Sequence, residues 1–477
     1  MNEKEDRMRA FGKMILSHLP YTPNKEQNLL IAALSFFCTA SEDDSVMLIN
    51  GYAGTGKTSL TGALVKALAD ERRKAVLLAP TGRAAKVFSE YSGHSAYTIH
   101  RKIYRQKSYS PEYGNFQLAE NKHTDTFFIV DEASMIPNSS TEGAAFGTGC
   151  LLDDLIHYVY SGVRCRLILL GDNAQLPPVG FADSPALSIE QLRSYGLKVY
   201  VQYLTQTARQ AEESGILHNA TILRCNMEQK VLAKPILHLA GCEDVEVLSS
   251  EYLIEKISDC YDHDGLNETI VITRSNKRAT MFNAGIRNQI LYREDELVSG
   301  DMLLVAKNNY YWSEAYEELD FIANGDVARV SRVRGETKAY GFRFADVTLE
   351  FPDHNVEVDA KVILDGLFSD SPALNREQNE RLFTEIYMEL EGDKRTRYKA
   401  LKQNPFYNAL QVKYAYTVTC HKAQGGQWSN VFIDMGYILK KHLLHLIFTG
   451  GYIQPLLEHA SECTLLIIPC VTNEIIF

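Results

Sequence analysis

A glycine-rich stretch close to residue 50 carries the residue types that bind a triphosphate. Residues 51–58 read GYAGTGKT and fit the pattern G-x-x-x-x-G-K-[ST]. Glycines allow backbone N–H groups to close around phosphate oxygens, Lys57 can neutralise the β and γ oxygens, and the Thr58 hydroxyl can hold Mg²⁺. The alternative is a glycine-rich turn that contains a lysine by chance. A short apolar run before the loop and a helical pattern after it favour the phosphate site.

Two acidic residues follow a second apolar run. In TFFIVDEASMI, Asp131 and Glu132 come directly after a segment with the composition of a buried strand. At the carboxyl end of a parallel strand, Asp131 can hold Mg²⁺ through water, and Glu132 can orient the water that attacks the γ-phosphate. Adjacent acids at a strand end are also common as plain solvated residues. Their pairing with the phosphate loop upstream favours the catalytic interpretation.

A third apolar run ends in polar residues of the same kind. CRLILLGDNAQLPPVG places Gln175 just beyond the run, where its amide is expected to lie within reach of the γ-phosphate. Alone, this segment could be a loop that stops at two prolines. Together with the first two segments it predicts a nucleoside triphosphatase of the helicase kind.

Bulk composition sets limits on the elements that position these residues. The chain has 477 residues, of which 45% are hydrophobic and 23% charged, so it is long enough for two to four cores. Its net charge of −11 argues against a surface that is basic all over, so a nucleic-acid site must be a local groove. The nine cysteines form no CxxC pair, which predicts neither a disulfide framework nor a zinc site. The N-terminus is charged and no apolar run reaches the length of a membrane span, so we expect a soluble cytoplasmic protein without a membrane partner.

The three segments belong to an ordered series that resembles the superfamily 1B helicases of the RecD, Dda and Pif1 group. The series extends over residues 22–436, nearly the whole chain, and its order is more specific than any single member. The resemblance implies ATP-driven translocation along single-stranded DNA in the 5′ to 3′ direction, with separation of a forked duplex. The matching segments are GYAGTGKTS, LLAPTGRAAKVFSE, TIHRKIY, IVDEASMI, LLGDNAQLPPVG, LTQTARQ with SGILHNATILR, VITRSNKRA and YTVTCHKAQGGQW.

The resemblance assigns residues to ATP. The segment YTPNKEQ is similar to an adenine-reading element, which points to Gln27, and TARQ places Arg209 where it would reach the γ-phosphate from the second motor domain, supported by Gln210. In TCHKAQG, Gln424 and Gly425 would couple DNA to the nucleotide. The expected catalytic residues are Lys57, Asp131, Glu132, Gln175 and Arg209. The expected nucleotide-binding residues are Gln27, Gly51, Gly54, Thr55, Gly56, Lys57, Thr58, Ser59 and Gly425, with Thr58 and Asp131 as ligands of Mg²⁺.

The resemblance also assigns residues to DNA. Two segments of the first motor domain would touch the DNA backbone, and TCHKAQG would do so from the second. A satisfied core histidine is the alternative for His421. The expected contacts are Pro80, Thr81, Arg83, Thr98, His100, Thr419, His421 and Lys422.

The fold class predicted is α/β, with two RecA-like parallel-sheet motor domains and two insertions. The first motor domain is expected at 1–203, and the second at 204–299 plus 409–477. Residues 300–408 interrupt the second motor domain. Their apolar and polar residues alternate with period two in segments separated by glycine, asparagine and aspartate turns, which favours a small β-barrel. This region resembles the SH3-like insertion of the group; an α/β surface decoration is the alternative. Three adjacent rings there, Tyr310, Tyr311 and Trp312, could stack on bases or divide between core and surface.

A β-hairpin insertion is expected at about 101–126. The sequence HRKIYRQKSYSPEYGNFQLAENKHTDT interleaves basic and aromatic residues around a turn at PEYGN. We predict that Tyr113 or Phe116 is the wedge that separates the strands of a fork. A plain surface hairpin is the alternative.

The tail departs from the group. In the group the second motor domain ends with a run like R-W-x-Y-T-A-x-T-R-A, whose arginine crosses to the γ-phosphate, but 437–477 contains no arginine, and 442–477 contains neither lysine nor arginine. Read from the third base of the Thr449 codon, the codons through His459 permit Arg-Trp-Ile-Tyr-Thr-Ala-Ile-Thr-Arg-Ala. We therefore expect that the tail from about 437 is translated out of frame, with a slip shortly after Gly436 and an accidental stop after Phe477. Chance is the alternative.

The shifted tail has physical consequences. The second sheet is expected to lose its last strand, and Arg209 would be left without its companion arginine. Two other functions follow as alternatives: a catalytically impaired remnant that binds ATP and DNA, or a P-loop ATPase that acts on a protein partner. RNA stays an alternative substrate, because no residue recognisably reads a 2′-hydroxyl.

Overall fold

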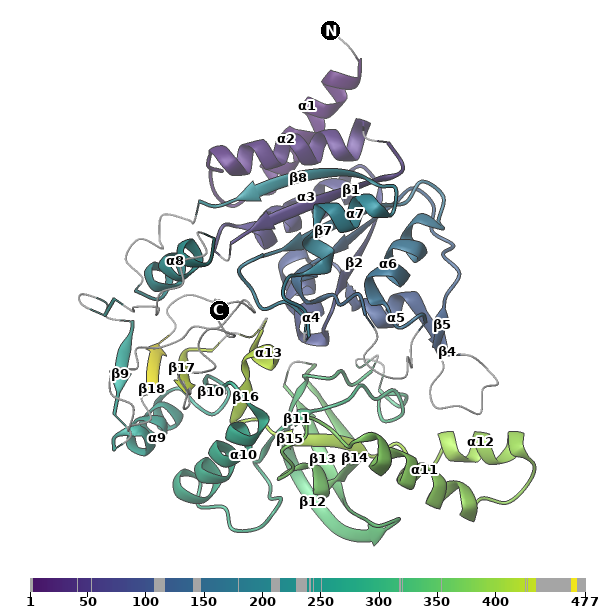
Figure 1. Cartoon of the computed structure of the whole chain (residues 1–477), viewed down its shortest axis with the longest axis vertical. Coiled ribbons are helices and arrows are strands. Elements are labelled where there is room, and N and C mark those ends of the chain that lie inside the picture. Colours follow the sequence, from purple (N-terminus) through teal and green to yellow (C-terminus); the bar gives the residue numbers. More distant parts are fainter. Residues whose placement is uncertain are drawn as a thin grey trace. The chain divides into compact units, whose positions relative to one another are not determined.

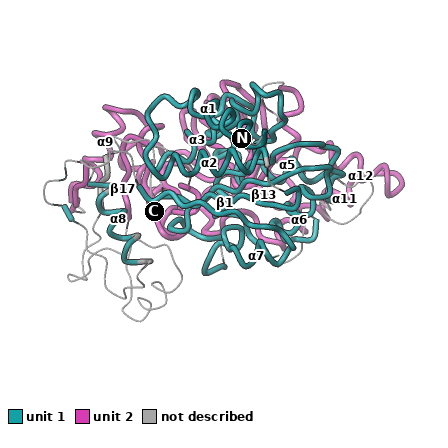
Figure 2. The backbone as a smooth tube through the Cα atoms, turned by 90° about the horizontal axis from the view of Figure 1, so that it is seen from above, with its two compact units in different colours: residues 1–242, 438–456, 476–477 teal, residues 243–437, 457–475 magenta. Residues whose placement is uncertain are grey.

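The structure is a computed structural model that divides into two compact units. It describes residues 3–434 and 465–469, except 41, 53, 107–115, 140–146, 179, 207–214, 229–237, 240–241, 243, 250, 317–318, 320, 353, 425 and 427. Unit 1 comprises residues 1–242, 438–456 and 476–477, and unit 2 comprises 243–437 and 457–475 (Figure 2). Each unit is described by itself.

A six-stranded parallel sheet organises unit 1. The strand order is β3-β2-β6-β7-β1-β8, and each neighbouring pair runs parallel (Figure 1). The strands are β1 (Ser45–Gly51), β2 (Lys74–Ala79), β3 (Ala96–Thr98), β6 (Thr126–Val130), β7 (Arg166–Gly171) and β8 (Lys198–Leu204). The helices are α1 (Glu3–Ser17), α2 (Lys25–Ala40), α3 (Lys57–Asp70), α4 (Gly82–Ser92), α5 (Ile99–Ile103), α6 (Leu151–Tyr160), α7 (Ile189–Ser194) and α8 (Gly215–Glu228).

Helices cover both faces of this sheet, which explains the near-continuous apolar runs of its strands. Alternate residues of one strand enter different cores: Met47 of β1 packs with the helices α1 to α3, whereas Leu48 packs with α6 and the residues around it. All seven residues of β1 and all five of β6 are buried. The first predicted motor domain therefore has the layered α/β architecture that its motifs indicate.

A two-stranded antiparallel hairpin projects from unit 1. It consists of β4 (Tyr104–Gln106), which follows α5 directly, and β5 (Phe116–Leu118). Both strands lie within 101–126, where a hairpin insertion is predicted. Residues 107–115, which follow β4 and include Tyr113, lie outside the described residues.

Unit 2 contains a second sheet, with the order β16-β10-β17-β18-β9. Its strands are β9 (Glu246–Leu248), β10 (Thr269–Thr273), β16 (Thr417–Thr419), β17 (Asn430–Asp434) and β18 (Leu465–Pro469), and its helices include α9 (Leu253–His263), α10 (Asn276–Gly285) and α13 (Cys420–Ala423). A turn of π-helix, Ile286–Ile290, follows α10. Strand β10 pairs parallel with β16 and β17, but β18 runs antiparallel to both of its neighbours.

The predicted loss of the last strand is wrong. Residues 465–469 form β18 between β17 and β9, although they lie in the tail that the codon reading places out of frame. A run that reads LLIIP is apolar and rich in strand-forming residues, so it can pair with an exposed strand edge whatever its origin. Its direction, opposite to that of its neighbours, departs from the parallel sheet that we predict.

A closed barrel of five strands also belongs to unit 2. It is built from β11 (Met302–Val305), β12 (Val327–Ala339), β13 (Phe342–Phe351), β14 (Val356–Ile363) and β15 (Leu410–Tyr414). Two helices, α11 (Arg376–Glu389) and α12 (Lys394–Lys402), lie between β14 and β15 in the sequence. A small β-barrel in this region agrees with the period-two pattern, and its closing strand lies just past the expected limit of 408. Among the helices described, none is long and apolar enough to cross a membrane.

Candidate nucleotide and nucleic-acid sites

The phosphate loop has the predicted strand–loop–helix geometry. Strand β1 ends at Gly51 and α3 begins at Lys57, with Gly56 at a φ of 85° that favours glycine. The Lys57 ammonium donates to the carbonyl oxygens of Gly51 at 2.5 Å and Tyr52 at 2.9 Å. These two bonds hold Lys57 across the loop, and the third ammonium N–H remains for a phosphate oxygen. Gly54, Thr55, Thr58 and Ser59 occupy the same loop and the first turn of α3.

The predicted adenine-reading residue contacts the loop directly. Gln27 is buried; its Nε2 donates to the Thr55 carbonyl at 2.9 Å, and its Oε1 accepts from the Asn24 backbone N–H at 3.0 Å. A glutamine side chain has two N–H groups and two lone pairs, so one of each remains for a base. Tyr21 lies beside it: a Cβ on Gly56 would come within 2.9 Å of the Tyr21 hydroxyl and 2.8 Å of Gln27 Nε2. Gly56 therefore permits this close approach.

The acidic pair lies at the same edge of the sheet as the phosphate loop. Strand β6 ends at Val130, so Asp131 and Glu132 extend from its carboxyl end. In the strand order, β7 separates β6 from β1, so the acids are two strands away from the phosphate loop. Glu132 has a φ of 52° and a ψ of 38°, a left-handed conformation that is uncommon outside glycine, and its N–H donates to Asp131 Oδ1 at 2.9 Å.

Gln175 lies beyond the intervening strand, β7, and is held to the acidic segment. Ser134 Oγ donates to Gln175 Oε1 at 2.8 Å. The loop is also tied to β1, because the Asn173 N–H donates to Asn50 Oδ1 at 3.2 Å. The structure thus brings the three predicted ATP segments to one edge. Across the described ranges, no group of three or more His, Cys, Asp and Glu side chains is placed to hold a metal ion by itself.

Two of the DNA candidates in unit 1 cap helices. Thr81 Oγ1 accepts from the Ala84 N–H at 3.2 Å at the start of α4, and Thr98 Oγ1 accepts from the Arg101 N–H at 3.3 Å at the start of α5. Thr98 is also buried, so its side chain serves the helix rather than an exposed contact. Pro80 and Arg83 flank the first of these caps and are partly exposed.

His100 lies one turn into the second of these segments. Burial lowers the pKa of His100 to about 4, so its imidazole is neutral at pH 7, and its ring lies 5.7 Å from that of Tyr104. Positive charge near this segment comes instead from Arg101 and Lys102, which lie 5.3 Å and 5.7 Å from the Tyr97 ring. The contact of this segment with DNA stays a prediction, and the structure places its positive charge on Arg101 and Lys102.

The DNA candidates of unit 2 lie around the short helix α13. Thr419 precedes this helix, and His421 and Lys422 lie on it, partly exposed. Burial lowers the pKa of both His421 and Lys422. Lys413, on β15, lies close enough for repulsion: burial and the Lys422 charge lower its pKa to about 8. Two neighbouring ammonium groups are a natural contact for a phosphate.

Several predicted residues lie outside the part of the chain described. These are Arg209, Gln210, Tyr113 and Gly425, and for Phe116 only the backbone is described. Tyr310, Tyr311 and Trp312 lie in a turn rather than a strand. Tyr310 stacks on Phe321 with centroids 5.2 Å apart, and Trp312 Nε1 donates to the Asn408 carbonyl at 2.8 Å. These contacts favour the structural interpretation of the three rings.

The positions of three residues that lie near the sites are not predicted by the sequence analysis. Tyr21 approaches the phosphate loop, Ser134 holds Gln175, and Lys413 neighbours Lys422. Tyr21 and Ser134 lie inside quoted motifs, so a local signal existed for both. Lys413 lies on a barrel strand, and no local pattern indicates that it lies near Lys422.

Two family models match the chain in the order of its two sheets. The AAA domain matches residues 24–233, and the UvrD-like helicase C-terminal domain matches residues 414–450. The first match contains the phosphate loop, the acidic pair and Gln175. The second contains β16, α13 and β17, and it ends at Gly450, where the shifted codon reading begins.

Curated relatives are similar over a larger part of the chain. The ATP-dependent RecD2 DNA helicase of Deinococcus radiodurans is 25% identical over 416 residues, which cover 83% of this chain and 44% of that protein. The ATP-dependent DNA helicase dda of Enterobacteria phage T4 is 26% identical over 324 residues, which cover 63% of this chain and 68% of that protein. The chain thus spans less than half the length of the RecD2 protein.

A solved structure of a similar kind is that of a Pif1 helicase from Bacteroides in complex with ADP-AlF3 and single-stranded DNA. It has a TM-score of 0.45 and 14% identity, and the match covers 91% of each chain. One family model is a helicase domain, and both curated relatives are ATP-dependent DNA helicases. The chain is similar to the superfamily 1B helicases of the RecD and Dda kind.

Proposed function

We propose that this chain is an ATP-dependent DNA helicase that moves along single-stranded DNA and separates a forked duplex. The observation that carries the proposal is the meeting of Lys57, Asp131 and Gln175 at the carboxyl edge of one parallel sheet. Ligands of open α/β sheets bind at this edge. Similarity to two DNA helicases supports DNA as the polymer along which hydrolysis drives the chain.

Each residue of the nucleotide site has a role that its geometry supports. Gln27 offers one N–H and one lone pair to adenine, and Lys57 offers an ammonium N–H to the β and γ oxygens. Glu132 orients the attacking water. Gln175 is held by Ser134, so its amide nitrogen remains free to donate to the reacting oxygens.

The donor set also fits Mg²⁺. Thr58 supplies a hydroxyl in the first turn of α3, and Asp131 supplies a carboxylate at the end of β6. Mg²⁺ prefers oxygen ligands and commonly takes one or two protein groups together with phosphate oxygens and water. When bound, the ion would neutralise charge on the β and γ oxygens.

The proposed DNA path uses backbone contacts from both units. In unit 1 these come from the N-termini of α4 and α5, capped by Thr81 and Thr98, and from Arg101 and Lys102. In unit 2 they come from Lys422 and Lys413. The 5′ to 3′ direction, and a role in repair, recombination or replication, rest on the family resemblance.

The two insertions have separate proposed roles. The β4–β5 hairpin is the pin that separates the strands, with Tyr113 or Phe116 as its wedge. The five-stranded barrel is an SH3-like clamp over DNA. The closed barrel and the antiparallel hairpin support these roles by their architecture.

The direct test is ATP turnover with and without single-stranded DNA. We expect DNA to raise turnover, and Lys57→Ala to abolish the increase. Lys66→Ala is the matched control, because Lys66 is an exposed lysine on the same helix, α3. Turnover that does not respond to DNA in the chain or in its tail-restored form would contradict the proposal and favour an ATPase with a protein partner.

A second function is favoured by the tail. Residues 437–477 contain no arginine, so this polypeptide would lack one of the two arginines expected at the γ-phosphate. Such a chain would bind ATP and DNA but hydrolyse slowly. Binding of both ligands without stimulated turnover, rescued by the restored tail, would identify this impaired form.

A further inference from the structure

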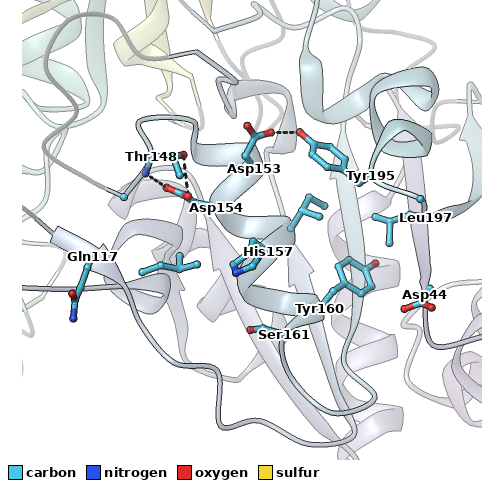
Figure 3. Close-up of a pocket in the computed structure, with 14 residues that line it drawn as sticks. Asp44, Gln117, Thr148, Asp153, Asp154, His157, Tyr160, Ser161, Tyr195 and Leu197 are labelled. Atoms are coloured by element: carbon cyan, nitrogen blue, oxygen red, sulfur yellow. Dashed lines mark hydrogen bonds between the residues drawn. The ribbon is translucent and has the colours of Figure 1, made fainter.

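The base of the hairpin is tied to α6 by a buried carboxylate. Asp154 Oδ2 accepts from the Tyr104 hydroxyl at 2.6 Å and from the Thr148 N–H at 3.0 Å, and its Oδ1 accepts from the Thr148 hydroxyl at 3.0 Å. Asp154 is 3% exposed and Tyr104 is 7% exposed. Tyr104 is the first residue of β4, so the bond joins the first strand of the hairpin to a core helix. Figure 3 shows the two hydrogen bonds between Asp154 and Thr148.

The backbone at Gly147 passes very close to this pair. Gly147 has a φ of 49°, and a Cβ at this position would lie 2.0 Å from Asp154 Oδ2 and 2.6 Å from Tyr104 Cε1. No other residue would allow the chain to pass so close to the pair. Burial, and then the Asp154 carboxylate, raise the pKa of the Tyr104 hydroxyl, so it stays a hydrogen-bond donor.

The returning arm of the hairpin is attached to the other end of α6. Asn121 Nδ2 donates to the carbonyl oxygens of Tyr158 at 2.8 Å and Val159 at 3.2 Å. These carbonyls lie in the last turn of α6, where the Tyr158 carbonyl also accepts from the Ser161 hydroxyl and the Val159 carbonyl from the Gly162 N–H. The hairpin is therefore fixed at both arms to one helix.

A pocket lies along α6 between these attachments. It has a volume of about 1150 Å³ and is lined by Gln117 of β5, by His157 and by Asp153. Figure 3 shows Gln117 on one side of the pocket and the α6 side chains on the other. Beside the pocket, Leu118 and Ala119 pack against the core that contains α6, so the hydrogen bonds of Tyr104 and Asn121 add fixed polar contacts to this apolar attachment.

We propose that Asp154 is a positioning residue that holds the strand-separating hairpin rigid through Tyr104. The inference rests on the proposed helicase function. A buried carboxylate is stable only when its oxygens are hydrogen-bonded, so removal of the Tyr104 hydroxyl would leave Asp154 without one of its three donors. Helix α6 packs by Leu152, Leu155 and Val159 into the core that also contains β6. The hairpin thereby shares a rigid support with the strand that ends at the catalytic acids.

The chain offers a matched control for this tie. Asp153, the neighbouring residue on α6, accepts a hydrogen bond from the Tyr195 hydroxyl, as Figure 3 shows. This second pair has the same chemistry but joins α6 to the end of α7 instead of the hairpin. Tyr104→Phe and Tyr195→Phe therefore remove equivalent hydroxyl groups with different consequences.

The first experiment measures amide hydrogen exchange in the full chain. We expect Tyr104→Phe to speed exchange at least 10-fold in residues 104–106 and 116–119, and Tyr195→Phe to leave it unchanged there. Asp154→Asn should act in the same direction as Tyr104→Phe, and the double variant should be no faster than either single one. Equal exchange rates in the two tyrosine variants would overturn the inference.

The second experiment measures base pairs opened per ATP hydrolysed on a forked duplex. We expect Tyr104→Phe to lower this ratio at least 3-fold while DNA-stimulated ATP turnover stays within 2-fold, whereas Tyr195→Phe leaves both unchanged. A ratio in Tyr104→Phe equal to that of the unaltered chain would overturn the positioning role. If the unaltered chain opens no fork even with its tail restored, the proposed helicase function fails. The exchange measurement alone then tests whether the bond between Tyr104 and Asp154 holds the hairpin.

Discussion

The Ser134 hydroxyl donates a hydrogen bond to the Gln175 side-chain oxygen, at 2.8 Å. This bond joins the segment after Asp131 and Glu132 to the loop after β7, over a sequence separation of 41 residues. Because the oxygen of the amide is engaged, its NH₂ group is directed elsewhere, and in the proposed site its target is the γ-phosphate or the attacking water.

We predict that Ser134→Ala lowers kcat for ATP hydrolysis by about 2- to 10-fold, the worth of one hydrogen bond, with KM for ATP nearly unchanged. The reason is that Gln175 would lose its orientation but not its contact with the ground-state nucleotide. Steady-state kinetics measures both constants. Gln175→Ala should be more severe, and the double variant no worse than Gln175→Ala; losses that multiply instead would show that the two residues act independently.

A second prediction concerns pH. Burial lowers the pKa of His100 to about 4, below the 6.5 of an unfolded histidine. Between these values the unfolded chain binds a proton that the folded chain does not, so the free energy of unfolding rises with pH in this window. The stabilisation is fully present above about pH 6.5 and is lost as the pH falls toward 4. From pH 7 to pH 5 we expect unit 1 to lose roughly 2 kcal/mol from this group.

The measurement is urea unfolding followed by far-UV circular dichroism at both pH values. The two tryptophans, Trp312 and Trp428, both belong to unit 2, so their fluorescence identifies the transition of unit 2 separately. His100→Gln should flatten the pH dependence of unit 1. His157→Gln, at an exposed position on α6, should not. An unchanged slope in His100→Gln would show that His100 is not the group responsible.

The sequence predicts those parts of the site whose signal is local. Each of three groups directly follows a strand in the sequence: the phosphate loop, the acids after β6 and Gln175. An apolar run followed by the right residue types is therefore sufficient to predict them. The tie between Tyr104 and Asp154 spans 50 residues and joins two segments without a common pattern, so only the fold discloses it. Thr98 shows a different limit: the motif predicts a contact with DNA but does not indicate that the side chain is buried and caps α5.

The second sheet shows another limit. An apolar run such as LLIIP predicts a strand but not its direction, and β18 runs antiparallel where the motifs imply a parallel sheet. The barrel can be predicted from the sequence because the alternation of its strands and its turn residues are local signals. Its closure by β15 cannot, because it depends on pairing with β11 and β14, which lie far away in the sequence.

A buried ion-pair network supplies the third prediction. Arg287 is 2% exposed and donates to both carboxylate oxygens of Asp301, at 2.9 Å and 3.0 Å, and Arg293 donates to the same carboxylate at 2.7 Å. Asp301 is fully buried and precedes β11, and Arg287 lies in the turn of π-helix after α10. The network therefore joins the second sheet to the barrel.

Asp301→Asn should lower the free energy of unfolding of unit 2 by about 3–5 kcal/mol, because it leaves guanidinium charge buried without its partner. Tryptophan fluorescence during urea unfolding reports this directly. Asp359→Asn is the control: its partner Arg334 and Asp359 itself are 47% and 54% exposed, and an exposed pair contributes about 0–1 kcal/mol. Equal losses in both variants would contradict a special role for the buried network.

The fourth prediction concerns the tail. The codons of residues 449–459, read from one base earlier, permit Arg-Trp-Ile-Tyr-Thr-Ala-Ile-Thr-Arg-Ala, and the match to the UvrD-like C-terminal domain ends at residue 450. We expect the gene to spell this run in the minus-one frame. A chain with that frame restored after Gly436 should regain an arginine at the γ-phosphate, which in related phosphoryl transfer is worth about 10³- to 10⁵-fold in kcat.

Sequencing the gene across the codons for Gly436 to Phe477 tests the first half of this prediction, and DNA-stimulated ATP turnover of the two chains tests the second. The control is the restored chain with its first new arginine changed to alanine, which should return to the slow rate. If the minus-one frame spells another sequence, the frame hypothesis is wrong. If the frame is as expected but both chains hydrolyse ATP equally fast, then Lys57 and the acids after β6 suffice for turnover, and the tail has another purpose.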